Sequence, residues 1–413
     1  MAKLIPTFLI FLCTIQIFSQ NEDPKIRVFL DCNFCDNTYI RQNLNNVQFV
    51  RDQNFADVHL FFLRQTNGSG GRLYEVDFIG KNEFEDLTDK ITFSTDSNMT
   101  NDDVRNRILD YIKLGLVAYW LEVGHTDVVT ITVGEREGGS DEETADEVED
   151  PWNYWVFQLN ARGSIDGEQT RKQLNVNFSV SARRVTERNK FFIRAGYSEN
   201  KSTFTYEGDD IVAIRQSKDI RVEDVVSING NWSVGAFGRV GSSVFRNLGF
   251  YYEFKPAIEY NFFDYSVSAE KQLALSYRNG IVFNDYIELS VFGKNEEMVW
   301  EHEIKLGGTV NQRWGNIYAE TSFQQYLHDT TLNAFRFNLG ANIRLFKGFN
   351  FNINGDYSIV GNQINLAAGD VSLEELLLRQ QQLASGYNYS LNIGFNYSFG
   401  SIYNTIVNPR FNF

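Results

Sequence analysis

The residues with the clearest chemical potential are Cys32 and Cys35, which form a CxxC motif. The motif follows a strand-like segment, 26–30, and precedes a helix-like segment, 37–44. In an oxidising compartment this spacing favours a disulfide. The alternatives are a thioredoxin-type thiol activated at the helix N-terminus, and half of a metal site that no second Cys/His pair completes. We predict the disulfide.

Residue patterns typical of catalysis are otherwise missing from the sequence. The four histidines, His59, His125, His302 and His328, are scattered and form no HExxH motif. Neither a GxSxG elbow nor a Walker A loop occurs. Because isolated histidines are usually structural, we predict no enzyme activity, no metal and no cofactor.

Charged residues of both signs gather on one face of the alternating segments that begin near residue 154. This face carries Arg162, Arg183, Arg239, Glu253, Lys255, Glu259, Arg278, Glu303, Lys305, Glu320, Arg336, Arg344 and Asp356. We interpret the set first as a ladder of internal ion pairs and second as the selectivity lining of a pore. Arg336 and Arg344 are expected beside the strand of Asp356, and Lys305 beside that of Glu320.

Strict alternation of apolar and polar residues indicates the elements that carry these charges. In 387–399 the odd positions are apolar or aromatic and the even positions are Asn, Ser or Gly. Such long two-faced strands are typical of a transmembrane β-barrel with lipid outside and a polar lumen. We predict twelve antiparallel strands, near 154–165, 171–185, 190–206, 211–228, 232–245, 249–262, 271–286, 297–312, 316–328, 333–346, 349–364 and 387–399.

The connections between these segments predict how the barrel is oriented. Tight turns such as 186–189 alternate with longer or more polar loops such as 364–386, as in bacterial outer-membrane barrels. An even strand number returns the C-terminal tail, 401–413, to the side of the N-terminal domain. Within the last loop, 370–384 is predicted to form an amphipathic helix that folds against the barrel mouth.

The first third of the chain predicts export and a separate small domain. Residues 1–19 have the pattern of a secretory signal peptide. Residues 24–133 read as an α/β domain with strands, a hairpin around 66–71 and a helix after Thr100, where Asp103 completes a capping box. Its element order resembles the small periplasmic domains of TolB-type and CsgG-type envelope proteins. An acidic linker, 134–153, joins it to the barrel at 154–400.

Composition supports this reading and excludes several classes of protein. Of the 413 residues, 15% are aromatic, which excludes a disordered chain. The net charge of -15 argues against nucleic acid as a partner. After the signal peptide no apolar stretch is long enough for a transmembrane helix.

Several longer segments together resemble a family of outer-membrane β-barrel proteins of Bacteroidota, with porin-like barrels and a small N-terminal periplasmic domain. They are FKGFNFNINGDYS (346–358), EELLLRQQQLASGY (374–387), YSFGSIYNTIVNPRF (397–411), DCNFCDNTYIRQ (31–42) and ADVHLFFLRQTNGSGG (56–71). The resemblance implies a location and an architecture but no functional residues.

The function expected from these observations is that of a structural or binding component of the cell envelope. We predict an integral, non-enzymatic component of the outer membrane that contacts lipid, with residues 24–133 in the periplasm as a possible site for a protein partner. The alternative is a porin-like channel or transport component for small solutes.

Overall fold

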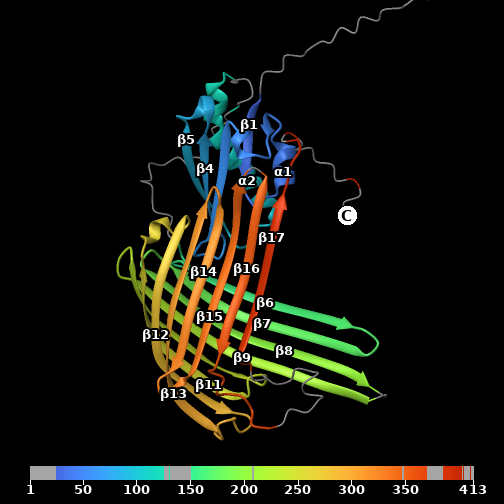
Figure 1. Cartoon of the computed structure of the whole chain (residues 1–413), viewed down its shortest axis with the longest axis vertical. Coiled ribbons are helices and arrows are strands. Elements are labelled where there is room, and N and C mark those ends of the chain that lie inside the picture. Colours follow the sequence, from blue (N-terminus) through green and yellow to red (C-terminus); the bar gives the residue numbers. More distant parts are fainter. Residues whose placement is uncertain are drawn as a thin grey trace, which may run out of the picture.

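The computed structural model of the chain contains two β-sheets, and Figure 1 shows the smaller one above strands of the larger. The structure describes residues 25–124, 130, 150–206, 209–346, 348–369, 385–401, 403 and 410. The predicted signal peptide, nearly all of the acidic linker, and the predicted helix at 370–384 lie outside these residues. None of the described helices is long and apolar enough to cross a bilayer.

The N-terminal sheet has five strands in the order β2-β1-β3-β4-β5. These are β1 (Ile26–Asp31), β2 (Val47–Phe49), β3 (Val58–Thr66), β4 (Arg72–Gly80) and β5 (Thr88–Thr95). β1 pairs in parallel with β2 and β3, whereas β3, β4 and β5 form an antiparallel meander. The sequence did not indicate β2, because three residues are too few to show an alternation.

Helices α1 (Asn37–Asn43) and α2 (Asn101–Glu122) complete this domain. Thr100 and Asp103 form the capping box that their spacing indicates. Ile112 and Leu116 of α2 are fully buried against the sheet, and the hydroxyl of Tyr119 donates to the carbonyl of Leu87 at 2.9 Å. The domain therefore has its own core, separate from the large sheet.

The large sheet contains the twelve predicted strands, all antiparallel and in sequence order. They are β6 (Trp155–Gly167), β7 (Arg171–Val185), β8 (Asn189–Tyr206), β9 (Asp209–Ser227), β10 (Trp232–Ser243), β11 (Leu248–Asn261), β12 (Lys271–Tyr286), β13 (Glu296–Gln312), β14 (Gly315–Tyr326), β15 (Asp329–Phe346), β16 (Phe349–Val360) and β17 (Tyr387–Tyr397). The strand number and order are confirmed.

The expectation of a closed barrel is not met among the described residues. No ladder joins β6 to β17 there, so the two strands are the free edges of a curved sheet. In Figure 1, β6–β9 run across the view while β14–β17 run nearly upright. Because twist accumulates from strand to strand, the two edges point in different directions.

The packing of α2 on its sheet gives a testable expectation at Gly115. A Cβ atom at this position would lie 2.1 Å from Cζ of Phe78, which is itself fully buried. We therefore expect Gly115→Val to destabilise the N-terminal domain by about 1–3 kcal/mol. Pulse proteolysis of the full-length protein in increasing urea measures this change.

The matched control for this substitution is Leu114→Val on the exposed side of the same helix, where the side chain is 58% exposed. We expect its effect to stay within about 0.5 kcal/mol. Equal stability of the native protein and the Gly115 variant would contradict the packing described here.

Candidate functional site

The inward face of the large sheet surrounds a polar cavity of about 460 Å³. Residues of β10 to β16 line it, together with the segment that follows β16. Where one strand contributes several lining residues, they are two or four positions apart, as the period of a strand requires for one face. Side chains on seven consecutive strands can share one cavity only if the sheet curves around it.

Lys255 is the centre of the ion network in this cavity. Its ammonium lies 2.8 Å from Glu301 and 3.1 Å from Glu253. Glu301 is on β13, two strands away, and also accepts a hydrogen bond from Gln324 on β14 at 2.6 Å. The Lys255 and Glu301 side chains are only 11% and 6% exposed. Their mutual attraction therefore offsets the cost of removing both charges from water.

Further ion pairs connect neighbouring strands. Lys305 contacts Glu320 at 2.8 Å, Arg278 contacts Glu303 at 4.0 Å, and Arg239 contacts Asp219 at 3.6 Å. The structure thus brings together most of the charges that sequence parity placed inward. Glu301 and Asp219 were missed, although Glu301 has the same parity as Glu303.

The other predicted inward charges have mixed surroundings. Glu259 accepts a hydrogen bond from the Tyr265 hydroxyl at 2.7 Å, and Asp356 accepts one from Ser390. Arg183 lies over the ring of Phe192. Arg336 donates to Gln324 at 3.3 Å, and Arg162 is exposed on the edge strand β6.

Arg344 lies on the strand beside that of Asp356, as predicted, but its partner is outside the large sheet. It lies near the end of β15, where its guanidinium contacts Asp31 of the N-terminal domain at 3.2 Å. The sequence could not show this pairing, because the two residues are 313 positions apart and belong to different domains.

The N-terminal domain contacts the large sheet at the end where the turns are short. Besides the Asp31–Arg344 pair, Arg51 donates to Ser398 just after β17, and Lys90 of β5 lies 3.5 Å from Glu270 just before β12. The tip of the β3–β4 hairpin reaches β7, since a Cβ at Gly68 would lie 2.9 Å from that of Val185. The domain therefore spans this end of the sheet from β7 to β17.

Asp31 is held by two basic side chains. Its carboxylate contacts Nε2 of the fully buried His59 at 3.1 Å as well as the guanidinium of Arg344. Burial alone would raise the pKa of Asp31, but the hydrogen bonds from His59 and Arg344 outweigh it and keep this pKa below its usual value. Burial also lowers the pKa of His59, so a neutral ring donates to the carboxylate at neutral pH.

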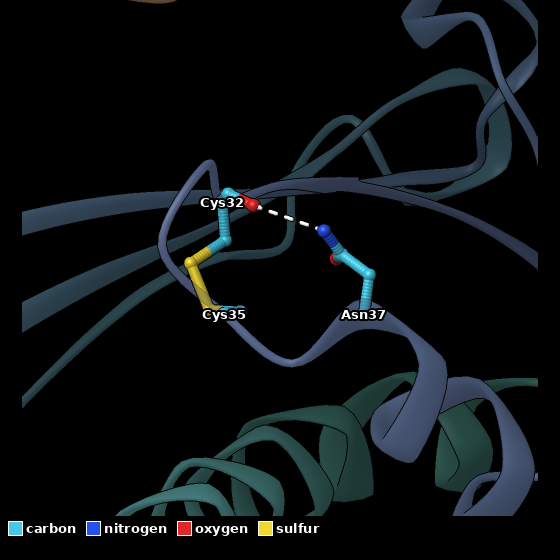
Figure 2. The surroundings of a disulfide bond; sticks show 3 residues. All are labelled: Cys32, Cys35 and Asn37. Carbon is cyan, nitrogen blue, oxygen red and sulfur yellow. Dashed lines mark hydrogen bonds between the residues drawn. A yellow bond between two sulfur atoms is a disulfide. The ribbon is translucent and has the colours of Figure 1, made fainter. Parts of the chain in front are cut away.

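The CxxC motif follows this contact directly. Cys32 and Cys35 are joined by a disulfide, and the side-chain amide of Asn37 donates to the carbonyl of Cys32 at 3.3 Å (Figure 2). Cys32 is 5% exposed. The disulfide fixes the turn between Asp31 and α1, which helps to position the Asp31 carboxylate.

The described histidines have ordinary structural surroundings. His302 lies 3.1 Å from the side-chain oxygen of Gln325, and His328 lies beside the ring of Tyr326. His125 is outside the described residues. Within the described part of the chain, no three His, Cys, Asp or Glu side chains are grouped so that they could hold a metal ion.

Comparisons with known proteins identify no family for this chain. No protein-family model matches the sequence, and no curated protein matches it. Among solved structures, the NanC porin is similar over 59% of this chain and all of its own, with 11% identity and a TM-score of 0.28. The predicted membership of a Bacteroidota family therefore stays a prediction.

The buried Lys255–Glu301 pair predicts a large cost for removing one partner. Lys255→Met would leave Glu301 buried without its cation, and we expect a loss of about 3–5 kcal/mol in stability. Thermal unfolding of the purified protein, followed by circular dichroism, measures this loss as a lower midpoint temperature.

Lys305→Met is the matched control, because the Lys305–Glu320 pair is more exposed, at 37% and 23%. We expect an effect of about 1 kcal/mol or less. A larger shift for the Lys305 variant than for the Lys255 variant would refute the ranking of the two pairs.

The Asp31–Arg344 contact predicts how firmly the N-terminal domain is held. We expect Arg344→Gln to broaden the distribution of distances between spin labels at Leu114 and Ile287, both exposed. Arg336→Gln, which removes an inward arginine that donates to Gln324, should leave the distribution unchanged.

The same contact should respond to pH. Because the pKa of Asp31 is lower in the folded protein than in the unfolded chain, its stabilisation is complete above the unfolded value of about 3.9 and is lost as pH falls through the folded pKa. The native distribution should therefore stay narrow from pH 7 to pH 5 and broaden only below about pH 4. Broadening near pH 6 would instead indicate titration of a histidine.

Proposed function

We propose that the protein is an outer-membrane channel of the porin-like type, with the N-terminal domain at its periplasmic mouth. The observation that carries this proposal is the two-sided character of the twelve-stranded sheet. Its inward face lines a polar cavity with ion pairs, whereas its outward face exposes large apolar side chains such as Phe254, Trp300 and Ile304. A sheet of this kind fits lipid on one side and water on the other.

In this proposal β6 and β17 pair with each other in the membrane and close the barrel. β6 begins at the end of the sheet that contacts the N-terminal domain, and β17 ends there, so the two edges are antiparallel as closure of an even-numbered barrel requires. Their outward side chains are among the most exposed, with Ile165 at 83% and Tyr389 at 70%. Unpaired edges would leave backbone N–H and C=O groups without partners in the hydrocarbon.

The channel is the second of the two functions that the sequence suggested. The arrangement of the inward charges favours a channel over a purely structural role. Arg246 and Arg336 line the cavity, and neither forms an ion pair among the described residues. A barrel filled by its own ion pairs would be expected to neutralise these cations. The proposed solutes are small and hydrophilic.

Conductance measurements test this function. We expect purified full-length protein to form stepwise ion-conducting openings in planar bilayers and to shift on a denaturing gel only after heating. Recovery of the mature protein in the soluble periplasmic fraction would refute the membrane location. Heat-modifiable protein that conducts no ions would refute the channel and favour the structural role.

A further inference from the structure

A second cleft, of about 520 Å³, lies between the N-terminal domain and the short-turn end of the large sheet. Asn33, Phe34 and Phe61 line it from the domain, and Arg344 borders it from β15. The feature that distinguishes its wall is a set of six asparagines from five consecutive strands: Asn311, Asn316, Asn342, Asn350, Asn352 and Asn396.

The strand register places four of these asparagines in one row. Asn311 is directly opposite Asn316, Asn316 is opposite Asn342, and Asn342 is opposite Asn352. Asn350 and Asn396 form a second opposed pair beside the row. Since neighbouring strands are about 4.8 Å apart, the amide groups repeat at that interval across β13 to β16.

Most of these amides are available to a ligand. Asn311 donates to the carbonyl of Ala269 at 2.9 Å. The other five side chains form no hydrogen bond with any residue that the structure describes. Asn352 lies across the strand from Gly394, where a Cβ would come within 2.5 Å of its side-chain oxygen, so a larger residue there would crowd this amide.

Three arginines line the cleft, Arg64, Arg313 and Arg344, and two of them are engaged by other side chains. Arg344 is paired with Asp31, and the guanidinium of Arg64 lies 4.2 Å from the ring centre of Phe34. Arg313 is the one cation of the lining without an ion pair among the described residues. The other polar groups left over are neutral amides, which outnumber it, and each offers a donor and an acceptor. A hydroxyl group also offers both, whereas an ion would be better served by an opposite charge.

We propose that this cleft binds neutral, hydroxyl-rich solutes of the saccharide class. Hydroxyl groups would exchange hydrogen bonds with the row of asparagine amides, and the less polar faces of the sugar rings would contact Phe34 and Phe61. The inference deepens the proposed function, because it names a solute class for a cleft at the mouth of the channel.

Binding of maltotriose to the detergent-solubilised full-length protein tests the inference by isothermal titration calorimetry. We expect saturable binding to the native protein and weaker binding of gluconate, which is also rich in hydroxyls but charged. Asn342→Leu combined with Asn352→Leu removes two amides from the row at similar side-chain volume. This double variant should weaken maltotriose binding at least about tenfold, or about 1.4 kcal/mol.

Asn354→Leu is the matched control, because Asn354 follows Asn352 on the same face of β16 but does not line the cleft. Its binding should stay within about twofold of the native protein. Asn342→Asp combined with Asn352→Asp keeps the shape and removes the donors, and it should also weaken binding; the heat-dependent gel shift verifies folding of each variant.

Three results would overturn the inference: no binding of maltotriose to folded native protein, tighter binding of gluconate, or an equal loss in the Asn354 control. Because binding is measured in detergent, it does not depend on conductance. A protein that conducts but does not bind maltotriose refutes the saccharide site alone, and one that binds but does not conduct refutes the channel alone.

Discussion

The pairing of extended backbone into one antiparallel sheet is the constraint on which the rest of this molecule depends. Each strand gives its backbone groups to its neighbours, so successive side chains must point to opposite faces. A shift of one residue in any register would exchange the apolar and polar faces of a strand. The twelve strands form eleven pairings, and each pairing has a fixed register. These registers bring the charges around Lys255 together and align the row of asparagines.

That constraint also explains which features the sequence predicted. Alternation over ten or more residues identifies a strand and its two faces, so all twelve strands and the inward side of Glu253, Lys255 and Glu303 could be predicted. It does not give the distance between side chains on different strands. The Lys255–Glu301 contact crosses β12, and such a contact depends on the curvature of the sheet and on the length of the lysine side chain.

The contact between the N-terminal domain and the large sheet could not be predicted from the sequence, for a different reason. Asp31, at the end of β1, is an ordinary strand-terminal residue in sequence, and Arg344 has the parity of an inward charge. Only the docked arrangement shows that the Asp31 carboxylate joins His59 of its own sheet to Arg344 of the other. The asparagine row could not be predicted either. In the sequence these residues are ordinary polar positions of separate strands, and only the strand registers place them side by side.

The position of the N-terminal domain bears on how the large sheet could close. Its contacts reach β7 through the tip of the β3–β4 hairpin and the end of β17 through Arg51. These two strands lie at or next to the free edges of the sheet. The N-terminal domain, which has its own buried core, therefore links the two sides of the sheet at the short-turn end. In the barrel that we propose, the remaining step is the pairing of β6 with β17, and in a bilayer the cost of unpaired backbone groups would favour that pairing.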